Sequence, residues 1–528
     1  VEQVEDTEGK MLQKIDSKVL DILDQEKYIE VLVYLKDRIE PNNIAEVTKK
    51  KVAVTSTTPY GAKLEVRKAV VEALQDQAEK TQVNLLKYIE QEKERGNVAE
   101  YKPYYIVNMI YVKATKEVIE NIAYLPEVEK IFKNEFIKLE RTVKNNPSGE
   151  LMGKNGEGTE WNIERIGANL VWDELGIDGT GAVIGLIDTG VVWDHPALKE
   201  KWRGYDPVTG AINPEGNWYD AVLRRDMPYD IQGFSHGTQV LGTILGQEPD
   251  GSNKIGVAPG AKWIAAKAFT IDGGLSNEII AAGEWMLAPG GDPTRAPDVI
   301  NNSWGGSNEK DDWFRDVVKA WRAAEIVPVF SVGTQKKGEP EQGPGSIANP
   351  GNYPESFAVA ATDKNNIRAP FSKLGPSPYD EDLIKPEISA PGVDIRSSVA
   401  EGYESGLDGT SMAAPHITGT VALLASANSS LKASEVEKII KDTATELTDD
   451  DYPNSPNCGY GYGLVNAFEA VSAAISGTGL ITGRVLVEGE DSEEPVIVHE
   501  QEVKKAFING HYRFDSSKIL KELLIEWN

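Results

Sequence analysis

The sequence predicts an α/β fold in which a parallel sheet carries helices on both faces, and two observations support this prediction. Apolar runs typical of buried strands alternate with stretches typical of helices across 162–475. The strand runs are 182–187, 263–268, 298–301 and 326–331, and the helical stretches include 276–286 and 311–324. In addition, Asp188 directly follows the first strand run, where a parallel sheet offers a ligand site at the carboxyl ends of its strands.

The first 140 residues are rich in Lys and Glu and predict a separate small domain. Strands are expected at 28–36, 104–114 and 128–133. One long amphipathic helix is expected over 63–95, ending before Gly96, and a short helix over 116–123. The order strand, helix, strand, helix, strand favours an α+β sandwich.

Two further segments complete the predicted domain organisation. Residues 141–160 are polar, with several Asn and Gly and few apolar side chains, so they are interpreted as a processing linker, although an ordinary connection would look similar. The α/β domain is placed at 161–476. Short strand candidates within 477–528 predict a small C-terminal β module to which no function is assigned.

Charge and composition narrow the class of protein. The chain has 528 residues with 83 acidic and 55 basic side chains, a formal net charge of −28. Such an excess of negative charge opposes binding to a polyanion, so nucleic acid is not an expected partner. Cys458 is the single cysteine, which rules out an intramolecular disulfide. No run approaches the roughly 18 uncharged apolar residues of a membrane span, and none is expected.

Three segments carry the chemistry: 183–190, 235–240 and 408–416. Ser411 lies between a small-residue turn and an apolar helical stretch, where its hydroxyl could attack a carbonyl. A serine needs a neighbouring base and a carboxylate that orients the base, and His236 and Asp188 are of these types. Each motif alone would be an ordinary turn or helix start. Together, in the order Asp, His, Ser, they predict a nucleophilic triad, whereas His195 and His416 are interpreted as structural.

These motifs resemble those of the subtilisin-like serine proteases, within which the secreted bacillopeptidase F group is most similar, over about 161–475. The resemblance implies a secreted serine endopeptidase, extracellular or at the cell surface, that acts on proteins and peptides and requires no cofactor for its chemistry. It also implies that the first domain is a ferredoxin-like prodomain. Such a domain acts as folding chaperone and inhibitor, leaves its tail in the active-site cleft, and is removed by self-cleavage in the linker.

The resemblance also implies two edges that pair with an extended peptide substrate. Glycines in these segments would let a substrate backbone approach closely, although plain turns also use glycine. Trp304 is expected to narrow or floor an apolar pocket. The expected substrate-binding residues are Gly274, Leu275, Ser303, Trp304, Gly305 and Gly333.

One position departs from the family pattern. Where the family carries an Asn whose amide donates to the oxyanion, this chain has Thr334. The backbone N–H of Ser411 is the other expected donor. Because the threonine side chain is shorter, catalysis is expected to be slow but not absent. The alternatives are a silenced protease that binds extended peptides without cutting them, and a surface-displayed adhesive protein suggested by the trailing β module.

Structural calcium is considered possible. The family often binds it through an acidic residue shortly after the Asp-Thr-Gly strand, but Ala197 stands at that place, so this site is expected to be absent. The oxygen-rich loops at 250–253 and 449–451 could hold calcium elsewhere, although exposed acidic loops are usually only solvated.

Overall fold

A computed structural model describes residues 12–55, 58–139, 143–144, 158–335 and 343–478. The chain divides into two compact units, residues 1–471 and 472–528. Of the second unit, the structure describes only the end of helix α14 (Ala467–Thr478). The predicted C-terminal β module at 477–528 therefore lies almost wholly outside the described residues.

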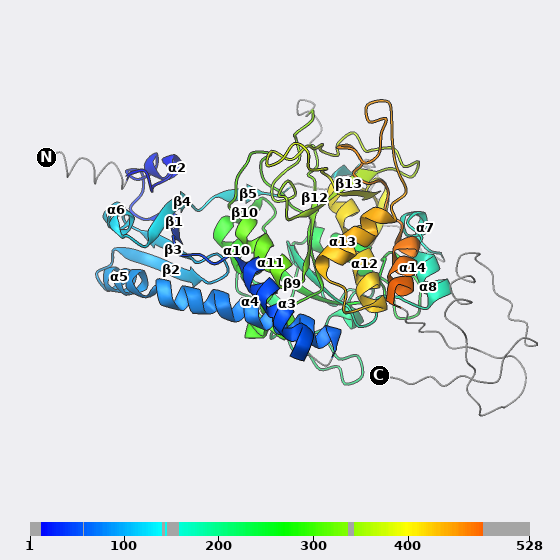
Figure 1. The fold of residues 1–528 in the computed structure, drawn as a ribbon, viewed down its shortest axis with the longest axis horizontal. Coiled ribbons are helices and arrows are strands. Elements are labelled where there is room, and N and C mark those ends of the chain that lie inside the picture. Colours follow the sequence, from blue (N-terminus) through cyan, green and yellow to red (C-terminus); the bar gives the residue numbers. More distant parts are fainter. Residues whose placement is uncertain (1–11, 56–57, 140–142, 145–157, 336–342, 479–528) are drawn as a thin grey trace, which may run out of the picture. The chain divides into compact units, whose positions relative to one another are not determined.

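The N-terminal region contains a four-stranded antiparallel sheet in the order β2-β3-β1-β4 among the described residues (Figure 1). The central strand β1 pairs with β3 from Ile29↔Ala114 and with β4 from Val31↔Lys133. Helices lie between β1 and β2 and between β3 and β4, which is the ferredoxin-like arrangement. The strands are β1 (Ile29–Leu35), β2 (Val98–Tyr104), β3 (Met109–Ala114) and β4 (Val128–Lys133).

The helices of this region correct one expectation. The single helix predicted over 63–95 is wrong: α4 (Pro59–Thr81) and α5 (Val83–Glu94) meet at Gln82. The side chain of Gln82 is buried and donates to Tyr104 O at 3.0 Å and Asn108 Oδ1 at 2.9 Å. These hydrogen bonds hold Gln82 against the turn that follows β2. The other helices are α2 (Ser17–Leu20), α3 (Pro41–Thr55) and α6 (Lys116–Tyr124).

The strand predicted over 104–114 is also wrong as one element. The structure has β2 and β3 joined by a turn at residues 105–108, and Asn108 in that turn has a φ of 45°. Asparagine adopts this left-handed conformation more readily than most residues, because its short polar side chain can hydrogen-bond locally. Three of the four turn residues, Tyr105, Ile106 and Val107, are aromatic or apolar, so hydrophobicity did not indicate a turn here.

The rest of the first unit is built on a seven-stranded parallel sheet in the order β14-β13-β12-β11-β7-β9-β8 among the described residues. Every residue of β11, β12 and β13 is buried, as expected of parallel strands covered on both faces. The fold class is confirmed. The strands are β7 (Val183–Asp188), β8 (Trp218–Asp220), β9 (Lys262–Lys267), β11 (Val299–Asn302), β12 (Val327–Ser331), β13 (Phe357–Thr362) and β14 (Ile388–Pro391).

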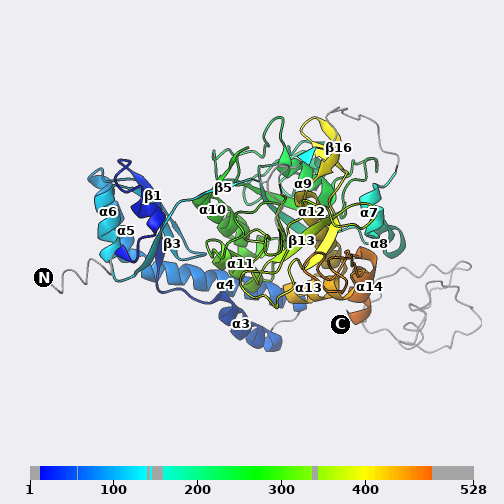
Figure 2. The same cartoon turned by 90° about the horizontal axis from the view of Figure 1, so that it is seen from above.

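Helices pack on the two faces of this sheet (Figure 2). One face contacts α9 (His236–Leu245) and the long buried helix α12 (Thr410–Ala427). The other contacts α10 (Ser276–Leu287) and α11 (Arg315–Ala323), which the N-terminal region in turn covers. The shorter α7 (Trp161–Arg165), α8 (Ala168–Leu175) and α13 (Ala433–Asp442) complete the described body.

Two small sheets join the segment after β4 to the body. Strand β5 (Phe136–Lys138) pairs antiparallel with β10 (Gly273–Leu275). Strand β6 (Val143–Lys144) pairs antiparallel with β16 (Gly402–Asp408), which pairs with β15 (Ile395–Val399). No helix within the described residues has the length and apolar character to cross a membrane.

Candidate active site

Asp188 and His236 form a buried hydrogen-bonded pair. Asp188 is the last residue of β7 and His236 the first of α9, and Asp188 Oδ1 accepts from His236 Nδ1 at 2.8 Å. Burial disfavours the charged imidazolium, but the charge of Asp188 and this hydrogen bond outweigh it, so the pKa of His236 is raised above 6.5. The opposite ring nitrogen, Nε2, is buried and has no hydrogen-bond partner among the described residues.

Ser411 lies in the first turn of α12, directly after the end of β16 and Gly409. Its hydroxyl donates to the Ser303 carbonyl oxygen at 3.3 Å, and the Ser303 hydroxyl donates to Ser411 O at 3.0 Å. A general base would have to replace Ser303 O as the acceptor of this proton. Hydrogen bonds of this kind are often loose without substrate and tighten only in the reacting complex.

A second carboxylate, which the sequence reasoning missed, fixes the aspartate to the histidine helix. Asp230 accepts from Thr189 Oγ1 at 2.7 Å, and from the main-chain N–H of Thr238 at 2.9 Å and its hydroxyl at 2.6 Å. Thr189 Oγ1 in turn accepts from Gly237 N–H at 2.9 Å. Burial raises the pKa of Asp230 against the effect of these donors. Asp230 stands in an irregular polar loop without periodicity or motif, so no sequence signal indicated it.

The side chain of Thr334 points toward the start of α12. Its Oγ1 accepts from the Thr410 main-chain N–H at 3.0 Å and shares a hydrogen bond with Thr410 Oγ1 at 2.9 Å. The predicted second donor, Ser411 N–H, lies in the first turn of the same helix, where main-chain N–H groups have no partner earlier in the helix. The two expected oxyanion donors therefore flank Thr410.

The predicted substrate-binding residues Gly274 and Leu275 lie on a strand edge that another backbone approaches. In the β5–β10 ladder Gly274 pairs with Ile137 and Leu275 with Phe136. A Cβ at the neighbouring Gly273 would lie 2.1 Å from Ile137 O, which only glycine permits. A cavity of about 420 Å³ adjoins β5, and among the residues that line it are Phe136, Ile137, Lys138, Gly305, Thr334 and Lys373.

Ser303, Trp304 and Gly305 follow β11, and Gly333 follows β12. The indole of Trp304 is fully buried among Phe269, Phe314 and Phe330. Its role as the floor of a substrate pocket stays a prediction. Gly333 has a φ of 100°, and a Cβ there would lie 2.8 Å from the Lys373 side chain, so the position favours glycine.

His195 and His416, the other two histidines among the described residues, are held by structural hydrogen bonds. His416 is buried, shares a 2.8 Å hydrogen bond with Asn162 Nδ2 and bonds Met412 O, and burial lowers its pKa to about 4. His195 bonds Gly402 O at 2.9 Å, and burial lowers its pKa as well.

Structural calcium stays a prediction. Ala197 is buried and offers no oxygen from its side chain. Asp250 and Asp449 each accept main-chain N–H groups of their own turns. In the described part of the chain, no three His, Cys, Asp or Glu side chains gather as a metal site would require.

Comparison with known proteins identifies the class. The chain is 50% identical over 506 residues to bacillopeptidase F of Bacillus subtilis (strain 168), covering 94% of this chain and 35% of that protein. It is 32% identical over 292 residues to subtilisin DY of Bacillus licheniformis, covering 55% of this chain and 91% of that protein. It is 33% identical over 308 residues to subtilisin Savinase of Lederbergia lenta, covering 58% and 96%.

Fold and similarity together define the class as serine endopeptidase. The model of the subtilase family matches residues 179–463, and the chain belongs to this family. Enzymes of the family need no cofactor for catalysis. The chain spans about a third of the length of the bacillopeptidase F that it matches.

Proposed function

We propose that the chain is the precursor of a secreted endopeptidase that cuts proteins through Asp188, His236 and Ser411. The buried Asp188–His236 hydrogen bond carries the proposal, because it orients the imidazole as a general base requires, and Nε2 has no partner among the described residues. Secretion agrees with the acidic composition and with the similarity to bacillopeptidase F. The substrates are extended peptide segments that pair along Gly273–Leu275.

The reaction follows from the three groups. His236 Nε2 takes the proton of Ser411 Oγ as this oxygen bonds to the scissile carbonyl carbon, and the Asp188 carboxylate stabilises the imidazolium. The imidazolium then gives its proton to the leaving amine as the C–N bond breaks. Water, deprotonated by the same imidazole, hydrolyses the acyl-serine and restores the hydroxyl.

The developing oxyanion is stabilised by Ser411 N–H, with Thr334 contributing little. The short Thr334 side chain ends at Thr410, whose N–H its hydroxyl accepts. Loss of one oxyanion donor costs roughly 10²- to 10³-fold in rate. The enzyme is therefore slow for its family. The same observation favours a second candidate, a silenced protease that holds peptides without cutting them.

The N-terminal region acts as chaperone and inhibitor. Strand β5 occupies the β10 edge that a substrate would use, so the region blocks the cleft. Strand β6 pairs with the end of β16, three residues before Ser411. The two pairings bracket the stretch between Leu139 and Val143, and the bond cut in self-processing lies there.

A carboxylate of the body also holds this region. Glu284 on α10 accepts the main-chain N–H groups of Tyr105 at 2.7 Å and Ile106 at 3.0 Å. Burial raises its pKa to about 7. The contact thus couples binding of the N-terminal region to proton uptake.

One incubation tests the proposal. The purified chain, a Ser411→Ala variant and a Thr334→Asn variant are followed by gel, by sequencing of the new N-terminus and by casein hydrolysis. The parent is expected to shorten slowly, Ser411→Ala not at all, and Thr334→Asn fastest. If Thr334→Asn alone cleaves the linker and casein, the silenced-protease hypothesis is correct. If none of the three cuts, the endopeptidase proposal fails.

A further inference from the structure

Arg67 of the N-terminal region is buried in the body of the protein. Its side chain extends from α4 and is 1% exposed. Nε donates to Ala324 O at 3.0 Å, Nη1 to Ala296 O at 3.0 Å, and Nη2 to Pro297 O at 2.9 Å. Each guanidinium nitrogen therefore finds a main-chain carbonyl of the body.

A carboxylate next to these carbonyls balances the charge. Asp298 Oδ1 lies 3.7 Å from Arg67 Nη2 and 3.2 Å from Lys63 Nζ, one turn earlier in α4. Asp298 Oδ2 accepts Val183 N–H at 3.1 Å, and Asp298 N–H donates to Val183 O at 2.8 Å. Since the sheet itself orients Asp298, the body presents this site already formed.

The arrangement suits a guanidinium and no other natural cation. Carbonyls that face Nε, Nη1 and Nη2 match the fixed, planar donor geometry of arginine, whereas a lysine ammonium could not face all of them at once. An uncharged side chain would leave three buried carbonyls without their donors and Lys63 as the cation still paired with Asp298, which is costly. The contact is thus both strong and specific for its occupant.

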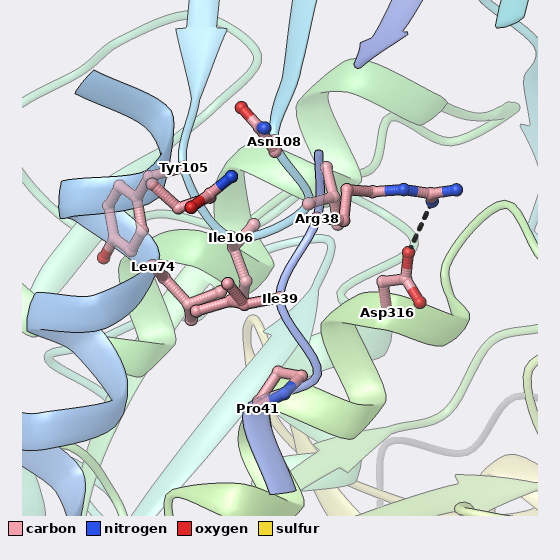
Figure 3. A pocket seen from close by; sticks show the side chains of 10 residues that line it. Arg38, Ile39, Pro41, Leu74, Tyr105, Ile106, Asn108 and Asp316 are labelled. Atoms are coloured by element: carbon pink, nitrogen blue, oxygen red, sulfur yellow. Dashed lines mark hydrogen bonds and ion pairs between the residues drawn. The ribbon is translucent and has the colours of Figure 1, made fainter. Parts of the chain in front are cut away.

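The site lies away from the catalytic cleft. Asp298 precedes β11, whereas Ser303 follows it, so the two are separated by the length of the strand. Further ion pairs continue the same contact, Lys49–Glu325 at 2.7 Å and Arg38–Asp316 at 2.8 Å. In Figure 3 the Arg38 side chain reaches Asp316 beside a small cavity that Ile39, Leu74 and Ile106 help to line.

We propose that Ala296, Pro297, Asp298 and Ala324 form a guanidinium-binding exosite that Arg67 occupies, and that keeps the N-terminal region on the enzyme after the linker is cut. The inference rests on the proposed processing of the linker. Cutting the linker then does not by itself free the cleft. Release of Arg67 from the exosite is the step that decides how long the cleaved fragment remains bound as inhibitor.

The test measures retention instead of activity. Full-length chain with Ser411→Ala receives the recognition sequence of an unrelated cysteine endopeptidase within 146–156 and is cut there. Dissociation of the N-terminal fragment from the immobilised body is then timed. Arg67→Ala is expected to dissociate at least about thirtyfold faster, as is typical of truncating one partner of a buried charge pair. Lys68→Ala, a change at an exposed neighbour on the same helix, is expected to keep the parent's rate.

Chemical rescue separates an exosite from general packing. Ethylguanidinium at millimolar concentration is expected to slow dissociation of Arg67→Ala and to leave Lys63→Ala unchanged, while ethylammonium at equal ionic strength rescues neither. In the parent complex ethylguanidinium is expected to lower the fraction of fragment retained, which tests the exosite even if Arg67→Ala does not fold. Parent-like dissociation of Arg67→Ala, or no specific effect of ethylguanidinium in the parent, overturns the inference. Because Ser411→Ala is inactive by design, a failed protease proposal would not alter these rates.

Discussion

Replacing Thr334 by Asn is expected to raise kcat of the processed enzyme by about 10²- to 10³-fold. In the present chain the Thr334 hydroxyl accepts Thr410 N–H at 3.0 Å and shares a hydrogen bond with Thr410 Oγ1 at 2.9 Å, so the short side chain ends at Thr410. An Asn amide reaches further and donates to the oxyanion, an interaction worth about 2.7–4 kcal/mol in comparable enzymes. Because the ground-state carbonyl gains little, KM is expected to change much less than kcat.

The assay is steady-state hydrolysis of a chromogenic peptide anilide by processed enzyme, with active sites titrated to correct for incomplete maturation. Thr334→Ala and Thr334→Ser are the matched controls, and both are expected to stay within a few fold of the parent. The reasoning is refuted if Thr334→Asn gains less than about fivefold. A fall of 10² or more in Thr334→Ala would show instead that the threonine hydroxyl itself stabilises the oxyanion.

Three further changes test the electrostatics of the site and of the N-terminal contact. Asp188→Asn is expected to lower kcat by about 10⁴-fold. In the parent, kcat/KM is expected to rise with pH through a midpoint above 6.5, the pKa of His236. The midpoint is expected to be lower in Asp188→Asn, because Asp188 raises the pKa of His236. The affinity of the body for the cut N-terminal fragment is expected to be highest below pH 4.5 and to fall by on the order of 10² as the pH rises through about 7, because Glu284 takes up a proton on association. Surface plasmon resonance measures this affinity, and Glu284→Gln is expected to abolish its pH dependence. Asp230→Ala, made in Ser411→Ala chain, is expected to lower the free energy of unfolding by about 2 kcal/mol in urea titrations, since the Thr189 and Thr238 donors lose a charged acceptor.

The parallel sheet could be predicted from the sequence because its signal is local. Strands such as β12 and β13 are apolar up to their last residue, and each motif residue of the site stands at a strand end or a helix start. The distance between Asp188 and His236 is not local information, yet parallel strands gather such ends at one edge. The motif pattern therefore predicted a pair that the structure joins at 2.8 Å.

The interactions that escaped prediction have no periodic signal. Gln82 divides a helix only because its amide bonds a turn 22 and 26 residues later. Asp230 and Arg67 form hydrogen bonds with groups that are distant in the sequence and that only the tertiary fold brings near them. Polar contacts of this kind depend on which residues the tertiary fold brings together, and the spacing of apolar residues in the sequence does not indicate them.

The strand order of the central sheet sets how the body must form. Strands β7 and β11 are neighbours, yet the hydrogen bond between Val183 and Asp298 joins residues 115 positions apart. Closing so many long loops before any pairing is rewarded makes such a sheet slow to assemble. A domain that folds this slowly without help also unfolds slowly once complete, if its late contacts are strong. Persistence of the folded body would then come from a kinetic barrier to unfolding.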